Sequence, residues 1–138
     1  MSDSVSNEEP LEKTDQETTV GELREMVGQF VGERDWHRFH TPKNISMAMA
    51  IEVAELMEHF QWLEGEPSRE IGNDPEKLAA VGEELADVLC YAFALANELG
   101  LEVGPIIRKK MIKNRQKYPI QEIRGRYGHN DPNPTSGQ

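Results

Sequence analysis

Residues 74–100 read DPEKLAAVGEELADVLCYAFALANELG, the longest helical pattern in the chain. Asp74 can cap a helix that begins at Pro75, where the missing backbone N–H of proline costs nothing. Apolar residues then recur at helical spacing as far as Leu99, and Gly100 follows where helices commonly end in a left-handed residue. The stretch therefore predicts one long amphipathic helix.

The residues before and after this stretch predict three more helices, over about 19–34, 42–63 and 105–118. The first begins with the capping-box pattern Thr19-Val20-Gly21-Glu22, and the second follows Thr41-Pro42 and is closed by Gly65. No segment alternates with period two for long enough to predict a strand. The predicted fold is all-α, a four-helix bundle core whose short connections favour antiparallel neighbours.

The two ends of the chain differ in composition from the part between them. Residues 1–18 are acidic and carry one basic residue, Lys13, so we expect a disordered acidic arm. Residues 121–138 are rich in Gly, Pro and Asn, and we expect a flexible tail there. A chain of 138 residues is long enough for one domain, which we place at 19–120.

Charge and hydropathy exclude several classes of protein. Fifteen Lys and Arg stand against 25 Asp and Glu, a net charge of −10, which argues against a nucleic-acid partner. No apolar run approaches the roughly 20 residues that cross a bilayer, and the first ten residues lack the features of a secretory signal. A lone cysteine, Cys90, fits a reducing compartment. We therefore expect a cytoplasmic protein with no membrane partner.

Four carboxylates fall close to the apolar faces of two predicted helices. At about 100° per residue, Glu52 lies inside the apolar stripe of its helix and Glu55 flanks that stripe. In the next long helix Glu84 lies among apolar residues, with Asp87 three positions on. A single Glu-x-x-Glu pair is usually a solvated face, but buried ionised carboxylates each cost several kcal/mol without a compensating cation. Two such pairs favour a shared metal site.

The ligand atoms of this site are all oxygens, which suits a hard cation such as Mg²⁺, with Mn²⁺ as a substitute. A di-iron bundle would instead need Glu-x-x-His on two helices, and neither helix has that motif. The last predicted helix carries six basic residues and no acid between them: Arg108, Lys109, Lys110, Lys113, Arg115 and Lys117. This cluster is either a solvated face or, beside a metal, the counter-charge for a polyphosphate.

Aromatic and histidine residues gather around the second predicted helix. Trp36 and Trp62 flank it, and each is either core or a flat surface for a nucleobase. We expect Phe39 and Phe60 in the core. We expect the histidines of the polar loop, His37 and His40, to be solvated, and we expect Cys90 to pack among apolar residues of the long helix.

Four stretches carry a resemblance to a known family: ERDWHRFHTPKN at 33–44, EVAELMEHFQW at 52–62, EELADVLCY at 83–91 and KMIKNRQKYP at 110–119. In their order and spacing they resemble the MazG-type all-α nucleotide pyrophosphohydrolases, specifically the small dCTP pyrophosphatase-like branch. The metal signature of that family, Glu-x-x-Glu followed by Glu-x-x-Asp, falls on Glu52, Glu55, Glu84 and Asp87.

The resemblance implies Mg²⁺-dependent cleavage of a nucleoside triphosphate, dCTP or a modified dCTP, between the α and β phosphates. It also implies a homo-oligomer, a dimer or tetramer, with sites near subunit interfaces. By similarity, Trp36 and Trp62 line the base pocket and Tyr91 lies beside the metal. For the attacking water two options stay open: Glu52 or Glu55 assists as general base, or a metal-bound hydroxide attacks without one. The residues implied to face the phosphates are Lys110, Asn114, Arg115, Lys117 and Tyr118. One position departs from the branch, where the first helix presents a histidine to the base and this chain has Val27.

Two other functions fit parts of the same pattern. A non-catalytic helical oligomer could bind nucleotides or a partner protein, although a scaffold gains nothing from acids in an apolar stripe. A hydrolase of the same superfamily could act on another substrate, such as dUTP, a modified deoxynucleotide or phosphoribosyl-ATP. A panel of nucleotides separates these substrates.

Overall fold

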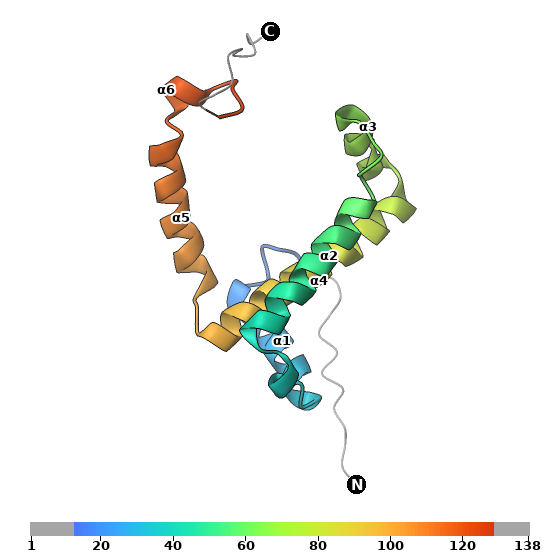
Figure 1. Ribbon diagram of the computed structural model, residues 1–138, viewed down its shortest axis with the longest axis vertical. Coiled ribbons are helices and arrows are strands. Elements are labelled where there is room, and N and C mark those ends of the chain that lie inside the picture. Colours follow the sequence, from blue (N-terminus) through green and yellow to red (C-terminus); the bar gives the residue numbers. More distant parts are fainter. Residues whose placement is uncertain (1–12, 129–138) are drawn as a thin grey trace. The chain divides into compact units, whose positions relative to one another are not determined.

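The computed structural model describes residues 13–128, and this part of the chain is built from helices and turns without a strand (Figure 1). The all-α prediction is confirmed. The helices are α1 (Val20–Glu33), η1 (His37–Phe39), α2 (Pro42–Glu58), α3 (Gly65–Glu70), η2 (Ile71–Asn73), α4 (Pro75–Leu99), α5 (Val103–Lys117) and α6 (Ile120–Ile123), where η denotes a 3₁₀ helix. The predictions for residues 1–12 and 129–138 lie outside the described residues.

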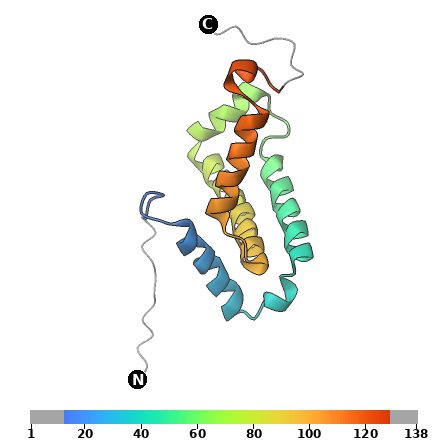
Figure 2. The same ribbon diagram turned by 90° about the vertical axis from the view of Figure 1, so that its left-hand side faces the viewer.

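The chain divides into two compact units, residues 1–100 and 101–138. In the first unit α2 and α4 lie side by side and run in opposite directions (Figures 1 and 2). Helix α1 also packs on α4, as does η2. Helix α4 is therefore the common partner of this unit, and three of the four predicted long helices meet there. The fourth, α5, belongs to the second unit together with α6.

The predicted signals for helix starts and stops are confirmed at both ends of α4 and at the start of α2. Asp74 accepts a hydrogen bond from the backbone N–H of Lys77 at 3.2 Å, and Pro75 is the first residue of α4. Gly100 ends α4 with a φ of 65°, a left-handed conformation that glycine adopts without steric cost. Thr41 caps α2 by accepting from the N–H of Asn44 at 3.2 Å.

The end of α2 differs from the prediction. The helix ends at Glu58 rather than near residue 63, because the backbone then changes to tighter turns in which Phe60 N–H donates to the Met57 carbonyl at 2.9 Å. Gly65, expected to close this helix, instead begins α3, and the loop expected after it contains α3 and η2. Pro67 is accommodated because it stands in the first turn of α3, where backbone N–H groups have no partner within the helix.

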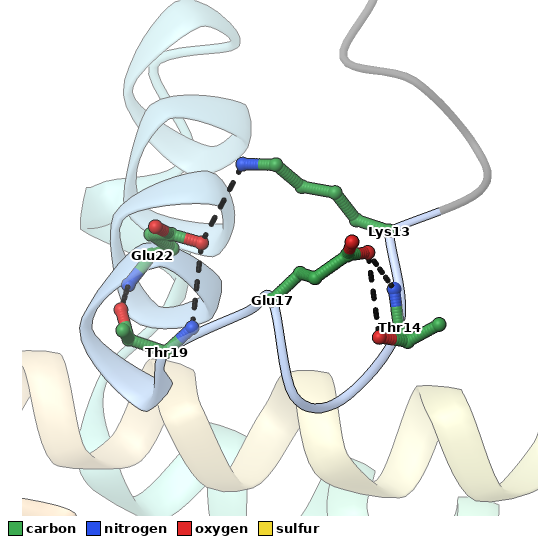
Figure 3. A network of polar contacts seen from close by, with 5 residues as sticks. All are labelled: Lys13, Thr14, Glu17, Thr19 and Glu22. Carbon is green, nitrogen blue, oxygen red and sulfur yellow. Dashed lines mark hydrogen bonds and ion pairs between the residues drawn. The ribbon is translucent and has the colours of Figure 1, made fainter.

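Both predicted terminal segments contain ordered local structure where they are described. Residues 13–18 form a turn in which Glu17 accepts from the Thr14 N–H at 3.0 Å (Figure 3). Thr19 and Glu22 then form the predicted capping box of α1. Helix α6 falls inside the expected C-terminal tail.

Few side chains among residues 13–128 are buried. Ile45 of α2, Ile71 of η2, and Ala94 and Ala96 of α4 form the core of the first unit. Phe39, expected in the core, is 57% exposed and lies under the guanidinium of Arg38, so that prediction was wrong. None of the helices among residues 13–128 is long and apolar enough to span a bilayer.

Candidate metal and nucleotide site

The antiparallel pair α2 and α4 brings three carboxylates of the first unit together. Glu52 and Glu55 are one turn apart on α2, and Glu84 faces them from α4. One side-chain oxygen from each lies within 4.8 Å of the other two. Residues three apart share a helix face, which is why the Glu-x-x-Glu spacing delivers both α2 carboxylates to the same point.

The surroundings of this cluster disfavour negative charge. Burial is the main reason that the pKa of Glu52 is raised above its ordinary value, and a hydrogen bond with Glu55 and repulsion by the neighbouring carboxylates raise it further. Burial is also the main reason that the pKa of Glu84 is raised, followed by repulsion from Glu55. Among the described residues, Glu52 Oε2 is buried and has no hydrogen-bond partner. An oxygen in this position is costly unless a cation or a proton binds it.

Two further ionisable groups act on the cluster. Asp87 is one turn beyond Glu84 on α4, and its charge contributes to the raised pKa of both Glu52 and Glu84. His59 lies just after α2 and lowers the pKa of Glu84, so its positive form stabilises that carboxylate. His59 had no role in the sequence prediction, because its spacing from Glu52 and Glu55 matches no metal motif considered there.

The cluster has the chemistry of a divalent-cation site. All its donors are carboxylate oxygens, which hard cations prefer. Opposite ligands of Mg²⁺ are about 4.2 Å apart, so oxygens within 4.8 Å of one another can converge on such an ion with small side-chain adjustments. The buried Oε2 of Glu52, which lacks a donor, fits a position for cation binding. Glu52, Glu55 and Glu84 therefore fit a divalent cation as ligands, and Asp87 lies next to this cluster.

A cavity of about 410 Å³ opens beside these carboxylates. Glu52 and Asp87 form part of its wall, and Trp36 and Tyr91 form another part. Most of the remaining wall is apolar and comes from α1 and α4: Met26, Val27, Phe30, Val31, Cys90 and Ala94, with His40 between. A mostly apolar cavity with a few polar groups at one end is typical of a small-molecule site.

Aromatic rings line up across this cavity. Trp36 and His40 are stacked with centroids 6.0 Å apart, and His40 and Tyr91 are stacked with centroids 6.5 Å apart. Phe30 meets the ring of Trp36 edge-on at 5.7 Å. His40 is therefore half-buried in a ring stack, and the prediction that it is solvated was wrong. His37 is largely exposed, with its Nδ1 2.8 Å from Oε1 of Glu98.

The backbone after α1 explains how this stack forms. Asp35 has a φ of 51°, a left-handed conformation that Asp tolerates better than most residues. It reverses the chain so that Trp36 N–H donates to the Val31 carbonyl at 3.1 Å. The 3₁₀ helix η1 then turns His40 back toward Trp36, whose carbonyl oxygen is 3.0 Å from His40 Nδ1. Sequence patterns do not predict this chain reversal, because in the sequence Asp35 is indistinguishable from the other polar residues of the loop.

Trp62, the second predicted base contact, is placed differently. It follows α2, is 87% exposed, and does not line the cavity that contains Trp36. The first unit thus brings together Trp36, Tyr91 and the four carboxylates of the predicted site, but not Trp62.

The predicted phosphate-facing residues all lie on α5 or at its end, in the second unit. Lys110, Arg115 and Lys117 are exposed, and Asn114 is half-buried with its Nδ2 3.9 Å from the sulfur of Met111. Lys117 Nζ lies 5.3 Å from the ring centroid of Tyr118. Helix α5 therefore presents cationic groups to solvent within its own unit.

The chain matches a family model over residues 47–128, and that model describes the MazG-like family. The chain belongs to the MazG-like family. The matched residues include Glu52, Glu55, Glu84 and Asp87 of the carboxylate site and all five predicted phosphate-facing residues of α5. Trp36 and His40 precede the matched region.

Relatives and a solved structure agree with this family membership. Over 110 residues the chain is 41% identical to dCTP pyrophosphatase 1 of Rattus norvegicus, covering 79% of this chain and 64% of the relative. It is 42% identical to the human dCTP pyrophosphatase 1 over 109 residues, covering 78% of this chain and 64% of the relative. A crystal structure of a pyrophosphatase from Archaeoglobus fulgidus matches with a TM-score of 0.65 and 37% identity, covering 72% of this chain and 91% of that one. The chain thus spans about 64% of the length of the curated relatives it matches.

Proposed function

We propose that this MazG-like protein hydrolyses a nucleoside triphosphate at the bond between the α and β phosphates, releasing a nucleoside monophosphate and pyrophosphate. The observation that carries the proposal is the carboxylate cluster of Glu52, Glu55 and Glu84 beside a mostly apolar cavity. The proposed substrate is dCTP or a modified dCTP, supported by relatives named dCTP pyrophosphatase 1.

Glu52, Glu55, Glu84 and Asp87 are proposed to hold Mg²⁺, with Mn²⁺ as a substitute. When bound, a divalent cation supplies electrostatic stabilisation of the charge that develops on the phosphates. Glu52 or Glu55 accepts a proton from the attacking water as general base.

The nucleobase is proposed to enter the cavity that Trp36 and Tyr91 line. Both residues line that cavity, and base–aromatic stacking is worth about 1–3 kcal/mol for each base. Trp62 is proposed as a further base contact on the resemblance alone, since it lies outside this cavity in the single chain.

The cationic face of α5 is proposed to neutralise the phosphate chain. Lys110, Arg115 and Lys117 supply positive charge, and Asn114 and Tyr118 supply hydrogen bonds. Arginine and lysine are suited to this task because their donors match phosphate oxygens.

A homo-oligomer, either a dimer or a tetramer, is part of the proposal. Met47 and Ile51 of α2 are each 60% exposed, and Leu85 and Leu89 of α4 are nearly half exposed. Apolar side chains grouped on neighbouring helices in this way favour burial against another copy. The proposed compartment is the cytoplasm, in which a lone cysteine such as Cys90 stays reduced.

The test is product analysis with the purified chain. The protein is incubated with Mg²⁺ and each of the four dNTPs, the NTPs, dUTP and 5-methyl-dCTP, with EDTA as the blank, and products are resolved by ion-exchange chromatography. We expect equal amounts of monophosphate and pyrophosphate, with the highest kcat/KM for deoxycytidine nucleotides. Release of orthophosphate and a nucleoside diphosphate would refute the bond position, and no release from any nucleotide would refute the enzymatic function.

A further inference from the structure

We propose that His40 determines which base sizes the nucleotide site accepts, because its ring is the partition between two neighbouring cavities. The proposal rests on the proposed function, since it assigns the cavity beside the carboxylates to the base. It concerns a residue that precedes the region matched by the family model.

Two cavities of similar size meet at His40. The first, of about 410 Å³, contains Glu52, Asp87, Trp36 and Tyr91 in its wall. The second, of about 370 Å³, is lined in part by Asn97 and Glu98, near the C-terminal end of α4. The residues shared by both walls are Val27, Val31, His40 and Ala94. Of these four, His40 has the largest side chain and the only polar one.

Three contacts restrict the ring of His40. It stacks on Trp36 with an interplanar angle of 10° and on Tyr91 with an angle of 19°. Its Nδ1 lies 3.0 Å from the Trp36 carbonyl oxygen, a hydrogen bond when Nδ1 carries the proton. A ring with two near-parallel aromatic neighbours and a hydrogen-bonded edge has fewer rotamers available than a free side chain.

With the His40 ring in place, a base in the first cavity does not reach the second cavity. Truncating His40 would join the two spaces and add up to about 370 Å³ to the 410 Å³ cavity. In the joined space a larger base could extend past the position of the His40 ring, where the wall of the separated cavity now stands. Changes in pocket size of this kind alter discrimination between substrates by about 10- to 200-fold.

The experiment compares four variants with the wild type: His40→Ala, His40→Asn, His40→Phe and His37→Ala. His40→Ala and His40→Asn both remove the ring, so one variant still gives a result if the other fails to fold. His40→Phe keeps a ring without the Nδ1 contact. His37→Ala is the matched control, because His37 lines only the second cavity and pairs with Glu98. Folding is checked by far-UV circular dichroism.

Two readouts are measured for each variant. The dissociation constants of α,β-imido-dCTP and α,β-imido-dATP are measured by isothermal titration calorimetry, which needs no turnover. The values of kcat/KM for dCTP and dATP are measured with Mg²⁺. In the truncated variants we expect the preference for the cytidine nucleotide to fall at least about tenfold, mainly through tighter binding of the adenosine nucleotide. We expect His40→Phe and His37→Ala to keep the wild-type preference within about threefold.

The outcomes separate the two proposals. An unchanged preference in both truncated variants would overturn the role of His40 and leave the proposed function intact. Equal losses for both nucleotides in the truncated variants would also overturn it, since that pattern indicates general loss of structure. Absence of binding and turnover in the wild type would overturn both proposals.

Discussion

Two groups of carboxylates in the first unit differ in how their charge is compensated. In the first turn of α1, Glu22 accepts from the Thr19 N–H at 3.3 Å and pairs with Lys13 at 3.9 Å, and just before this helix Glu17 accepts from Thr14 (Figure 3). Between α2 and α4, Glu52 and Glu84 are held where burial and neighbouring acids raise their pKa values.

The difference is between acids that are compensated by neighbouring donors and acids that are not. In the first group, hydrogen-bond donors and the Lys13 ammonium from the same segment compensate the carboxylates, so no ligand from outside the chain is required. The second group leaves Glu52 Oε2 buried without a hydrogen-bond partner. Such a cluster lowers the stability of the protein until a cation or protons bind, which is a common property of functional sites.

The largest effect is expected from Glu84→Gln, which keeps the shape of the side chain and removes its charge. Loss of a metal ligand should lower kcat by at least about 100-fold. Mutation of residues that only hydrogen-bond to metal ligands already lowers metal affinity or activity by about 10- to 100-fold. The matched control is Glu83→Gln, the exposed neighbour on α4, which should stay within about twofold of wild type. Turnover of Glu84→Gln close to wild type would remove this residue from the site.

The second prediction concerns pH and the metal-free protein. Glu84 has a raised pKa, so the folded state binds its proton more tightly than the unfolded chain does, where the ordinary value is 4.5. This carboxyl therefore contributes stability below pH 4.5 that is lost as pH rises through its raised value. In EDTA we expect Glu84→Gln to have a higher Tm than wild type at pH 7.5 and a smaller advantage near pH 4.5.

Adding Mg²⁺ should reverse that order at pH 7.5, because the cation stabilises only a folded protein with an intact site. The measurement is a set of thermal melts of wild type, Glu84→Gln and Glu83→Gln with EDTA or Mg²⁺. A Glu84→Gln variant less stable than wild type in EDTA at pH 7.5 would show that the cluster supports the fold without metal.

The third prediction compares the two tryptophans. Trp36→Ala removes a ring that lines the cavity, and we expect KM to rise about tenfold with a smaller change in kcat, from the lost stacking. Trp62→Ala removes a ring that is 87% exposed in the single chain, and a smaller rise in KM is expected. Steady-state kinetics with dCTP measure both. A larger effect at Trp62 would mean that the cavity beside Trp36 is not the main base contact.

The smallest effect is expected from Thr19→Ala, which changes the group of compensated carboxylates at the start of α1. The Thr19 hydroxyl accepts from the Glu22 N–H at 3.1 Å, and loss of an N-cap costs about 1 kcal/mol. Urea unfolding should show this loss while kcat/KM stays within about twofold. A large loss of activity would contradict the separation between the two groups of acids.

The sequence predicted the long helices because their ends carry strong local signals. Asp74, Thr41 and Gly100 act through contacts with residues close in sequence, so local patterns are sufficient. The same holds for Glu52 and Glu84, since helical winding alone places each on the side of its helix that meets the other. The expected bounds of α2 were too long because a change from α-helical to tighter turns leaves little trace in apolar spacing.

The features that the sequence did not predict depend on contacts between distant residues. His40 was expected in solvent, but its stacking on Tyr91 joins residues 51 positions apart and depends on the left-handed backbone at Asp35. Phe39 was expected in the core because it is aromatic, but the same reversal directs the neighbouring side chain into the cavity and leaves Phe39 exposed. The Trp36 side of the site is therefore a tertiary property, whereas the carboxylate side can be derived from helix periodicity.

Direct binding of Mn²⁺ tests the central claim that Glu52, Glu55 and Glu84 form a cation site. Mn²⁺ is titrated into wild type, Glu84→Gln and Glu83→Gln, and the signal of the unbound ion is followed by electron paramagnetic resonance, with Mg²⁺ as competitor. We predict saturable binding to wild type and Glu83→Gln that Mg²⁺ displaces, and affinity at least about 100-fold weaker in Glu84→Gln. Equal affinity of Glu84→Gln and wild type, or no saturable binding to wild type, would contradict the claim.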